Sequence, residues 1–315
     1  MRSPADMDCI QIDVTNKCHL SCTHCTRLVG HHHQPYRLTL EGVENALISL
    51  KGFKGIIGCM GGEPASHPQF LDIISLYKKH VPLGQRELWT AGLHWERYKE
   101  HIHNVFEKGL VSFNDHSDAD KGWHQPLLIA IEEILPDKKD EKLKNNLIKN
   151  CWVQNRWSAA ITNKGAFFCE VAAAQNQLFN GPPGWKVEPG WWKRTPEDKD
   201  FKDQVKKYCN KCSACVPMPM IPNNHDPADW VSPGNAKRLE AVGSPKFKQG
   251  RYKVMDLKKI REYVRTGSGE AGKDRGELKD FPKWTPWNYR GEWHHEPGEG
   301  ALTAKEVLKI QKGKE

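Results

Sequence analysis

Residues 16–25 read Asn16-Lys17-Cys18-His19-Leu20-Ser21-Cys22-Thr23-His24-Cys25 and place three cysteines in the spacing C-x3-C-x2-C. Iron–sulfur clusters that only carry electrons are usually held by four cysteines. A triplet offers three thiolates to a cubic four-iron cluster, so one iron lacks a protein ligand and can bind a small molecule. The spacing therefore indicates chemistry at a cluster. Two alternatives are a structural zinc site, which favours two C-x2-C pairs, and three unrelated buried thiols.

The triplet resembles the motif of the radical S-adenosylmethionine (SAM) superfamily, with His24 where an aromatic residue usually stands. The resemblance implies that Cys18, Cys22 and Cys25 hold a [4Fe–4S] cluster whose open iron chelates the amino and carboxylate groups of SAM. It also implies that an electron from this cluster splits SAM into methionine and a 5′-deoxyadenosyl radical.

A second motif, Gly61-Gly62-Glu63-Pro64, follows an apolar run at 55–60 that predicts a short buried strand. Glycines after a strand let the backbone approach a ligand closely, and a carboxylate there can pair with an ammonium group. The motif is similar to the family's GGEP segment, which holds the amino group of SAM. The resemblance therefore implies that Gly61, Gly62 and Glu63 bind the cofactor. Alone, such a segment is most often only a turn.

Two further predicted strands, at 86–90 and 110–114, end in polar residues. They resemble the family's strand ending in Thr-Asn-Gly and the strand whose Ser or Asn contacts the ribose of SAM. The resemblance implies cofactor-binding roles for Thr90, Ser112 and Asn114. The alternative is that both are generic strands followed by polar turn residues.

Between these motifs, predicted strands alternate with predicted helices. Such alternation favours a parallel sheet with crossover helices, in which ligands lie at the carboxyl ends of the strands. The fold class is therefore α/β, and the resemblance implies a shortened partial (β/α) barrel over residues 1–150. The predicted strands are 8–14, 55–60, 86–90 and 110–114, and the predicted helices are 38–51 (with Thr39 as N-cap), 68–80, 96–108 and 125–135.

Five later cysteines fall in one region around a predicted β-hairpin at 158–169. The region resembles the twitch domain, a shortened relative of the SPASM domain, which binds an auxiliary [4Fe–4S] cluster. The resemblance implies such a domain at 151–220. The family pattern favours Cys151, Cys169, Cys212 and Cys215 as ligands, with Cys209 as an alternative ligand. A zinc ribbon on the same thiolates is the other interpretation.

The cysteines outside both ligand sets are Cys9, Cys59 and, on this choice, Cys209. Cys59 lies two residues before Gly61, near the strand end predicted to face SAM. It is the candidate catalytic residue, a donor that returns a hydrogen atom to a substrate radical. The commoner fate of a free cysteine is a small buried thiol in a core.

The 315-residue chain carries a formal charge of +8, and its basic residues gather near the end. Residues 237–261 hold nine Lys or Arg and two Asp or Glu. Basic residues among aromatic ones can bind a polyanion, so residues 221–315 are predicted to form a basic, loop-rich tail that wraps the core or binds nucleic acid. A solvated surface is the alternative. His31-His32-His33 and His294-His295 are predicted to be solvated loops.

These features predict a radical SAM oxidoreductase or isomerase that abstracts hydrogen from a small polar or phosphorylated substrate. The outcome would be dehydrogenation, epimerisation or rearrangement, with a flavodoxin or ferredoxin as electron donor. One alternative acts on a modified base in DNA or RNA. Others are a peptide-modifying enzyme, for which no leader-binding domain is evident, and a non-catalytic Fe–S or zinc protein that binds nucleic acid. Without a signal peptide or a long apolar run, a cytoplasmic protein away from membranes is expected.

Overall fold

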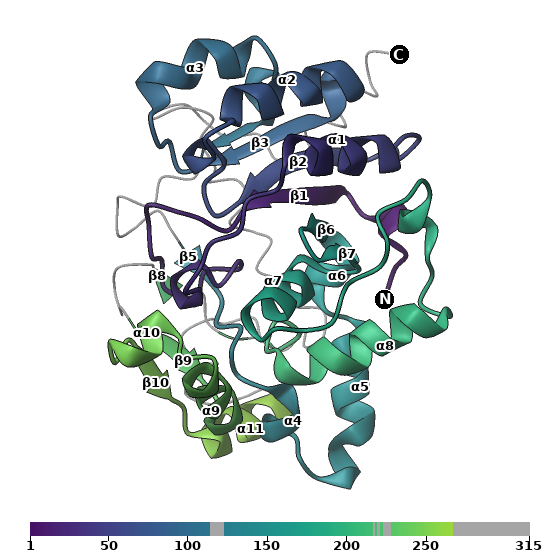
Figure 1. The fold of residues 1–315 in the computed structure, drawn as a ribbon. Coiled ribbons are helices and arrows are strands. Elements are labelled where there is room, and N and C mark those ends of the chain that lie inside the picture. Colours follow the sequence, from purple (N-terminus) through teal and green to yellow (C-terminus); the bar gives the residue numbers. More distant parts are fainter. Residues whose placement is uncertain (114–122, 217, 219–220, 223–227, 267–315) are drawn as a thin grey trace.

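The computed structural model describes residues 1–113, 123–216, 218, 221–222 and 228–266. Its main sheet has six strands in the order β4-β3-β2-β1-β6-β7 (Figure 1). All neighbours pair in parallel except β6 and β7, which are antiparallel. The predicted α/β class is thus confirmed, while the partial-barrel form stays a prediction. The strands are β1 (Cys9–Thr15), β2 (Ile56–Gly61), β3 (Arg86–Thr90), β4 (Val111–Phe113), β6 (Ser158–Thr162) and β7 (Gly165–Phe167).

The central strand β1 is buried along its whole length, as expected of a parallel strand covered on both faces. Three helices connect the first four strands: α1 (Leu40–Ser49), α2 (Phe70–His80) and α3 (Trp95–His103). Figure 1 shows these helices together beside β1, β2 and β3. Thr39 caps α1, since its side chain accepts a hydrogen bond from Gly42 N at 3.0 Å. The helices and strands predicted up to residue 113 are confirmed to within a few residues.

The predicted helix at 125–135 is wrong over most of its length. The short strand β5 (Trp123–His124) pairs with β8 (Ile221–Pro222), and helix α4 covers only Ile131–Ile134. Pro126 disfavours helical backbone in the residue before it, and Leu128 forms an isolated bridge with Val231. Two helices that were not predicted follow, α5 (Glu141–Lys149) and α6 (Trp152–Arg156).

The predicted hairpin is present, and it extends the main sheet. Strand β6 lies parallel to β1 with Cys9 opposite Ser158, and β7 forms the edge beyond it. Helix α7 (Glu170–Leu178) follows β7, and helix α8 (Lys199–Tyr208) leads to the last cysteines. The hairpin therefore takes a place in the sheet beside the strand that enters the cysteine loop.

Residues 228–266 are regular, so the prediction of a loop-rich tail is wrong for this part. Ser232 and Ser244 cap two of its helices, each with a proline at the start of the helix. Figure 1 shows this segment next to the loop after β1, whereas residues 267–315, with His294 and His295, lie outside the described residues. No helix in the described ranges is long and apolar enough to cross a membrane. The segment contains β9 (Asp229–Val231), α9 (Pro233–Ala241), α10 (Pro245–Lys248), β10 (Tyr252–Val254) and α11 (Leu257–Thr266).

Candidate active site

The cysteine triplet lines a cavity of about 80 Å³ at the carboxyl ends of β1, β2 and β3. Cys18, Cys22 and Cys25 form one wall of this cavity, which we call the triplet cavity. The ends of the neighbouring strands contribute Gly61, Gly62, Thr90 and Ala91. The structure thus brings the triplet together with three of the six residues predicted to bind the cofactor.

The thiols of the triplet are half-buried and free of disulfides. Burial raises the pKa of Cys18 and of Cys22 to about 12, because poor solvation penalises a thiolate. A bound metal centre reverses this preference, since a coordinating thiol is deprotonated. The donor set therefore suits a metal centre.

Gly61 and Gly62 allow two backbone segments to touch. Gly61 has a φ of +144°, and a Cβ there would lie 2.0 Å from Thr15 O. A Cβ on Gly62 would lie 2.4 Å from Lys17 O. Gly62 N donates to Thr15 O at 2.7 Å. Both glycines therefore allow the end of β2 to touch the end of β1 and the start of the cysteine loop. This role differs from the predicted approach to a ligand. Both glycines also line the triplet cavity.

Glu63 is fully buried and connects the ends of β2 and β3. Its Oε1 accepts hydrogen bonds from Ala65 N at 3.0 Å and Thr90 Oγ1 at 2.8 Å, and its Oε2 accepts one from Ala91 N at 2.7 Å. Burial raises its pKa to about 7, although the three hydrogen bonds favour the charged form. An ionised carboxylate can accept about four hydrogen bonds, so Glu63 retains capacity for one more donor.

Other predicted site residues lie away from the triplet cavity. Ser112 Oγ donates to Glu87 Oε1 at 3.1 Å, and both side chains are buried. Asn114 lies outside the described residues. Cys59 is fully buried in the core, where its thiol interacts with Tyr77 of α2 and burial raises its pKa. The structure does not bring Glu63, Ser112 or Cys59 to the wall of the cavity. The hydrogen-donor role of Cys59 stays a prediction.

The later cysteines surround a second cavity, of about 20 Å³. All five line it, so the choice between Cys209 and the other four candidate ligands stays open. Burial raises the pKa of Cys212 to about 12 and also raises the pKa of its neighbours. In the described ranges, no three His, Cys, Asp or Glu side chains converge on a point that could hold a single metal ion. A multi-iron cluster instead takes its thiolates on separate irons around a cavity. The five are Cys151, Cys169, Cys209, Cys212 and Cys215.

A buried ion-pair network joins the two cysteine regions. Arg27, two residues after Cys25, donates from Nε to Asp13 Oδ1 at 3.0 Å and from Nη1 to Glu170 Oε1 at 2.9 Å. Glu170 follows Cys169 directly and also accepts a hydrogen bond from Ser158 Oγ. Sequence reasoning missed this network because its members are far apart in the chain and belong to no motif.

A smaller cavity of about 10 Å³ adjoins the triplet cavity, since Arg27 and Gly61 line both. Two buried amide groups at its wall, Asn16 Nδ2 and Gln177 Oε1, have no hydrogen-bond partner among the described residues. A buried donor and acceptor without partners are costly unless a ligand or water satisfies them. A cavity of this size has room for about one water molecule, which could satisfy both groups.

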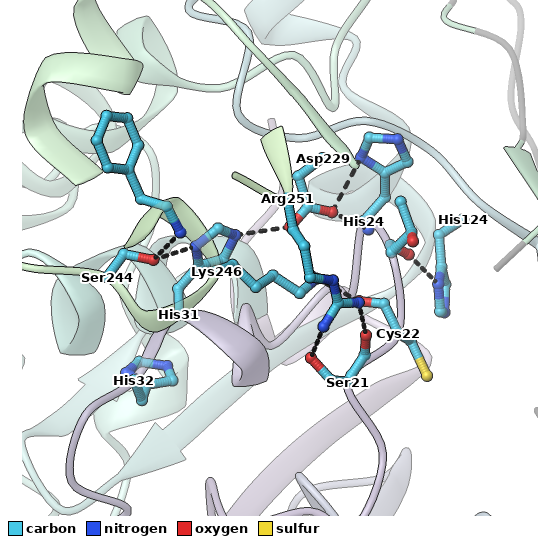
Figure 2. A network of polar contacts seen from close by, with 12 residues as sticks. Ser21, Cys22, His24, His31, His32, His124, Asp229, Ser244, Lys246 and Arg251 are labelled. Atoms are coloured by element: carbon cyan, nitrogen blue, oxygen red, sulfur yellow. Dashed lines mark hydrogen bonds and ion pairs between the residues drawn. The ribbon is translucent and has the colours of Figure 1, made fainter. Parts of the chain in front are cut away.

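The prediction that residues 31–33 form a solvated loop is wrong for His31. Its side chain is buried, with Nε2 2.7 Å from Asp229 Oδ2 and Nδ1 2.7 Å from Ser244 Oγ (Figure 2). His32 is half-buried, and its Nε2 lies 3.3 Å from Arg27 O. The partners of His31 come from residues about 200 positions later, which is why local sequence gave no signal.

Comparisons with known proteins found no matching family model and no matching curated protein. Two solved structures show a weak likeness. One is the crystal structure of BtrN in complex with AdoMet and 2-DOIA, with a TM-score of 0.42 and 15% identity over 65% of this chain and 88% of that chain. The other is selenomethionine BtrN in an open conformation, with a TM-score of 0.42 and 16% identity over 67% and 90% of the two chains. A likeness at this level carries no argument about activity.

Proposed function

We propose that the chain is a radical SAM enzyme whose catalytic [4Fe–4S] cluster is held by Cys18, Cys22 and Cys25. The observation that carries the proposal is the triplet cavity, in which three thiols face the glycine turn after β2 and the end of β3. Three cysteines leave one coordination position of a four-iron cluster for a ligand. When bound, such a cluster supplies the electron that cleaves SAM reductively.

The protein's own residues would bind and orient the cofactor. Glu63 can accept a further hydrogen bond, which suits the ammonium group of SAM, and its carboxylate fixes Thr90 and Ala91 at the wall of the cavity. Gly61 and Gly62 let the turn after β2 approach the cysteine loop. Ser112 does not line the triplet cavity, so its ribose contact has no support from the described residues. The ribose contact of Asn114 stays a prediction.

The second cysteine cavity is proposed to hold an auxiliary [4Fe–4S] cluster. Five cysteines from three separate stretches of chain line this cavity, and none of them forms a disulfide. A shared metal cluster explains why so many free thiols lie together. The network of Arg27 and Glu170 lies between this cavity and the triplet cavity. If bound there, such a cluster would supply a one-electron acceptor close to the triplet cavity, and for this reason we propose dehydrogenation rather than the other outcomes.

The substrate is proposed to be a small polar molecule that approaches the triplet cavity. The unpartnered Asn16 Nδ2 and Gln177 Oε1 lie beyond Arg27 in a space that holds about one water molecule, so they do not by themselves form a substrate site.

Anaerobic reconstitution followed by reduction with dithionite tests the proposal. The protein should take up about eight irons and convert SAM to methionine and 5′-deoxyadenosine, because two four-iron clusters are expected. The triple variant C18A/C22A/C25A should retain about four irons and lose SAM cleavage. Zinc in the second site would contradict the auxiliary cluster, and iron uptake without any SAM cleavage would contradict the activity.

A further inference from the structure

The loop that carries the triplet is held by side chains from the end of the described chain. Residues 17–28 form no helix or strand, so their buried backbone polar groups need other partners. Arg251 Nη2 donates to Ser21 O at 2.9 Å, and its Nη1 donates to Ser21 Oγ at 3.0 Å. Lys246 Nζ donates to the backbone oxygen of Cys22 at 2.7 Å. Figure 2 shows both cations pointing at this short stretch of loop.

Asp229 and His124 hold the next two residues of the loop. Asp229 Oδ1 accepts a hydrogen bond from His24 N at 2.5 Å, and His124 Nδ1 donates to Thr23 O at 2.9 Å. Every residue from 21 to 24 therefore has a backbone group satisfied by a side chain outside the loop (Figure 2). The loop takes its shape from these contacts.

Lys246 is fitted closely into the loop. Its side chain is 2% exposed, and Nζ also lies 2.8 Å from Asp229 Oδ2. Its stem passes Gly30, where an added Cβ would lie 2.5 Å from Lys246 Cε and 2.6 Å from Ser21 Oγ. Any larger residue at position 30 would displace Lys246. This buried cation is therefore part of the structure around Cys22.

Asp229 balances the charge of Lys246. Although burial opposes it, the hydrogen bond from His31 and the charge of Lys246 hold the pKa of Asp229 well below its usual range. Lys246 Nζ and Asp229 Oδ2, 2.8 Å apart, form a buried ion pair. The positive end contacts the oxygen of Cys22, and the negative end contacts the amide of His24.

We propose that Lys246, Asp229 and Arg251 are positioning residues of the catalytic cluster, which fix the cysteine loop and set the charge beside Cys22. The inference rests on the proposed function. Reduction adds negative charge to a cluster, and charge and hydrogen bonding around a cluster tune its potential. Lys246 should therefore favour the reduced cluster, while Asp229 should oppose reduction.

The charge effect can be measured by redox titration of the reconstituted protein, monitored by electron paramagnetic resonance. K246M should lower the potential of the catalytic cluster and D229N should raise it, each changing the reduced-to-oxidised ratio roughly tenfold at a fixed potential, which corresponds to about 59 mV. The double variant D229N/K246M should return close to the wild-type value. The auxiliary cluster serves as an internal control, and K248M, at an exposed position on α10, is the matched control.

Hydrogen exchange on the protein before reconstitution tests the positioning role separately. The amide of His24 should exchange faster in D229N and D229N/K246M, because its acceptor is weakened or lost. The double variant matters since a single change leaves one buried charge uncompensated and can unfold the segment. Unchanged protection of His24 would overturn the positioning role, and equal potentials in K246M, D229N and wild type would overturn the charge effect.

The two proposals fail in distinguishable ways. If the wild-type protein binds no cluster, the proposed function and the charge effect are both wrong, while exchange at His24 still decides whether the late segment holds the loop. If the cluster forms and SAM is cleaved normally with no change in potential among the variants, only this inference is wrong.

Discussion

Glu63 shows how one buried side chain can join two strand ends and keep the capacity to accept a further hydrogen bond. Its pKa of about 7 lies above the ordinary value of 4.5, because burial disfavours the charged form. In the unfolded chain the group ionises near pH 4.5. Between that value and pH 7 the folded state binds more protons, so this residue makes the folded state less stable as pH rises. Above pH 7 its contribution becomes constant.

SAM affinity should therefore rise with pH through about 7 in the wild-type protein, since only the charged form of Glu63 pairs with an ammonium group. E63Q should bind SAM about tenfold more weakly at pH 8 and show a flatter pH profile. Calorimetric titration of SAM into the reconstituted protein between pH 6 and 8 measures both. E96Q, in an exposed ion pair on α3, is the control. Equal affinity of E63Q and wild type at pH 8 would show that Glu63 does not bind the cofactor.

At the scale of elements, Arg27 of the cysteine loop forms ion pairs with Asp13 of β1 and Glu170 of α7. These ion pairs attach α7, and the hairpin of β6 and β7 before it, to the loop. Arg27, Asp13 and Glu170 are almost completely buried. Removing the cation leaves two carboxylates in a poorly solvated interior. Breaking a buried pair on one side typically costs about 3–5 kcal/mol.

R27M should lower the free energy of unfolding by about 3–5 kcal/mol, as measured by urea denaturation. The control K99M breaks an ion pair whose side chains are 42% and 82% exposed, and it should cost less than about 1 kcal/mol. A loss of similar size in the two variants would show that the network does not hold the hairpin to the loop.

Local patterns predicted the elements that depend on neighbouring residues. The apolar run before Gly61 and the Asn163-Lys164-Gly165 turn carry their own signals, and both predictions were confirmed. The helix predicted at 125–135 failed because Leu128 bridges to Val231 and Pro126 interrupts the pattern. The two cysteine groups were found by spacing. The contacts of Lys246 and Asp229 with the loop span more than 200 residues, so no local pattern could reveal them.

At the scale of the molecule, several basic side chains of residues 237–261 contact other parts of the protein. Arg251 and Lys246 contact the cysteine loop, and the Arg238 guanidinium lies 3.7 Å from the centre of the Phe179 ring. The rings of Phe247 and Tyr252 stack on each other at 4.2 Å. Because these groups already have partners within the protein, fewer of them can contact a polyanion than the sequence predicted. Lys237 and Lys258 remain exposed and could still do so.

Binding of a DNA or RNA oligonucleotide should then depend on the exposed lysines. Affinity should fall steeply between about 50 and 200 mM salt, and the variant K237E/K258E should bind more weakly with a smaller salt slope. Fluorescence anisotropy at several salt concentrations measures the slope. K51E, an exposed change just after α1, should leave it unaltered. Absence of binding at low salt would leave this region as a solvated surface.

The contacts of Asp229 and Lys246 with the cysteine loop also affect when this loop can take its shape during synthesis. During translation, Cys22 is synthesised more than 200 residues before Asp229 and Lys246. At usual rates of elongation, this interval lasts roughly 10 to 40 s. Throughout it the nascent chain has its three thiols but lacks the residues that will shape their loop. The thiols are thus open to iron or to oxidants until the late segment emerges from the ribosome and docks.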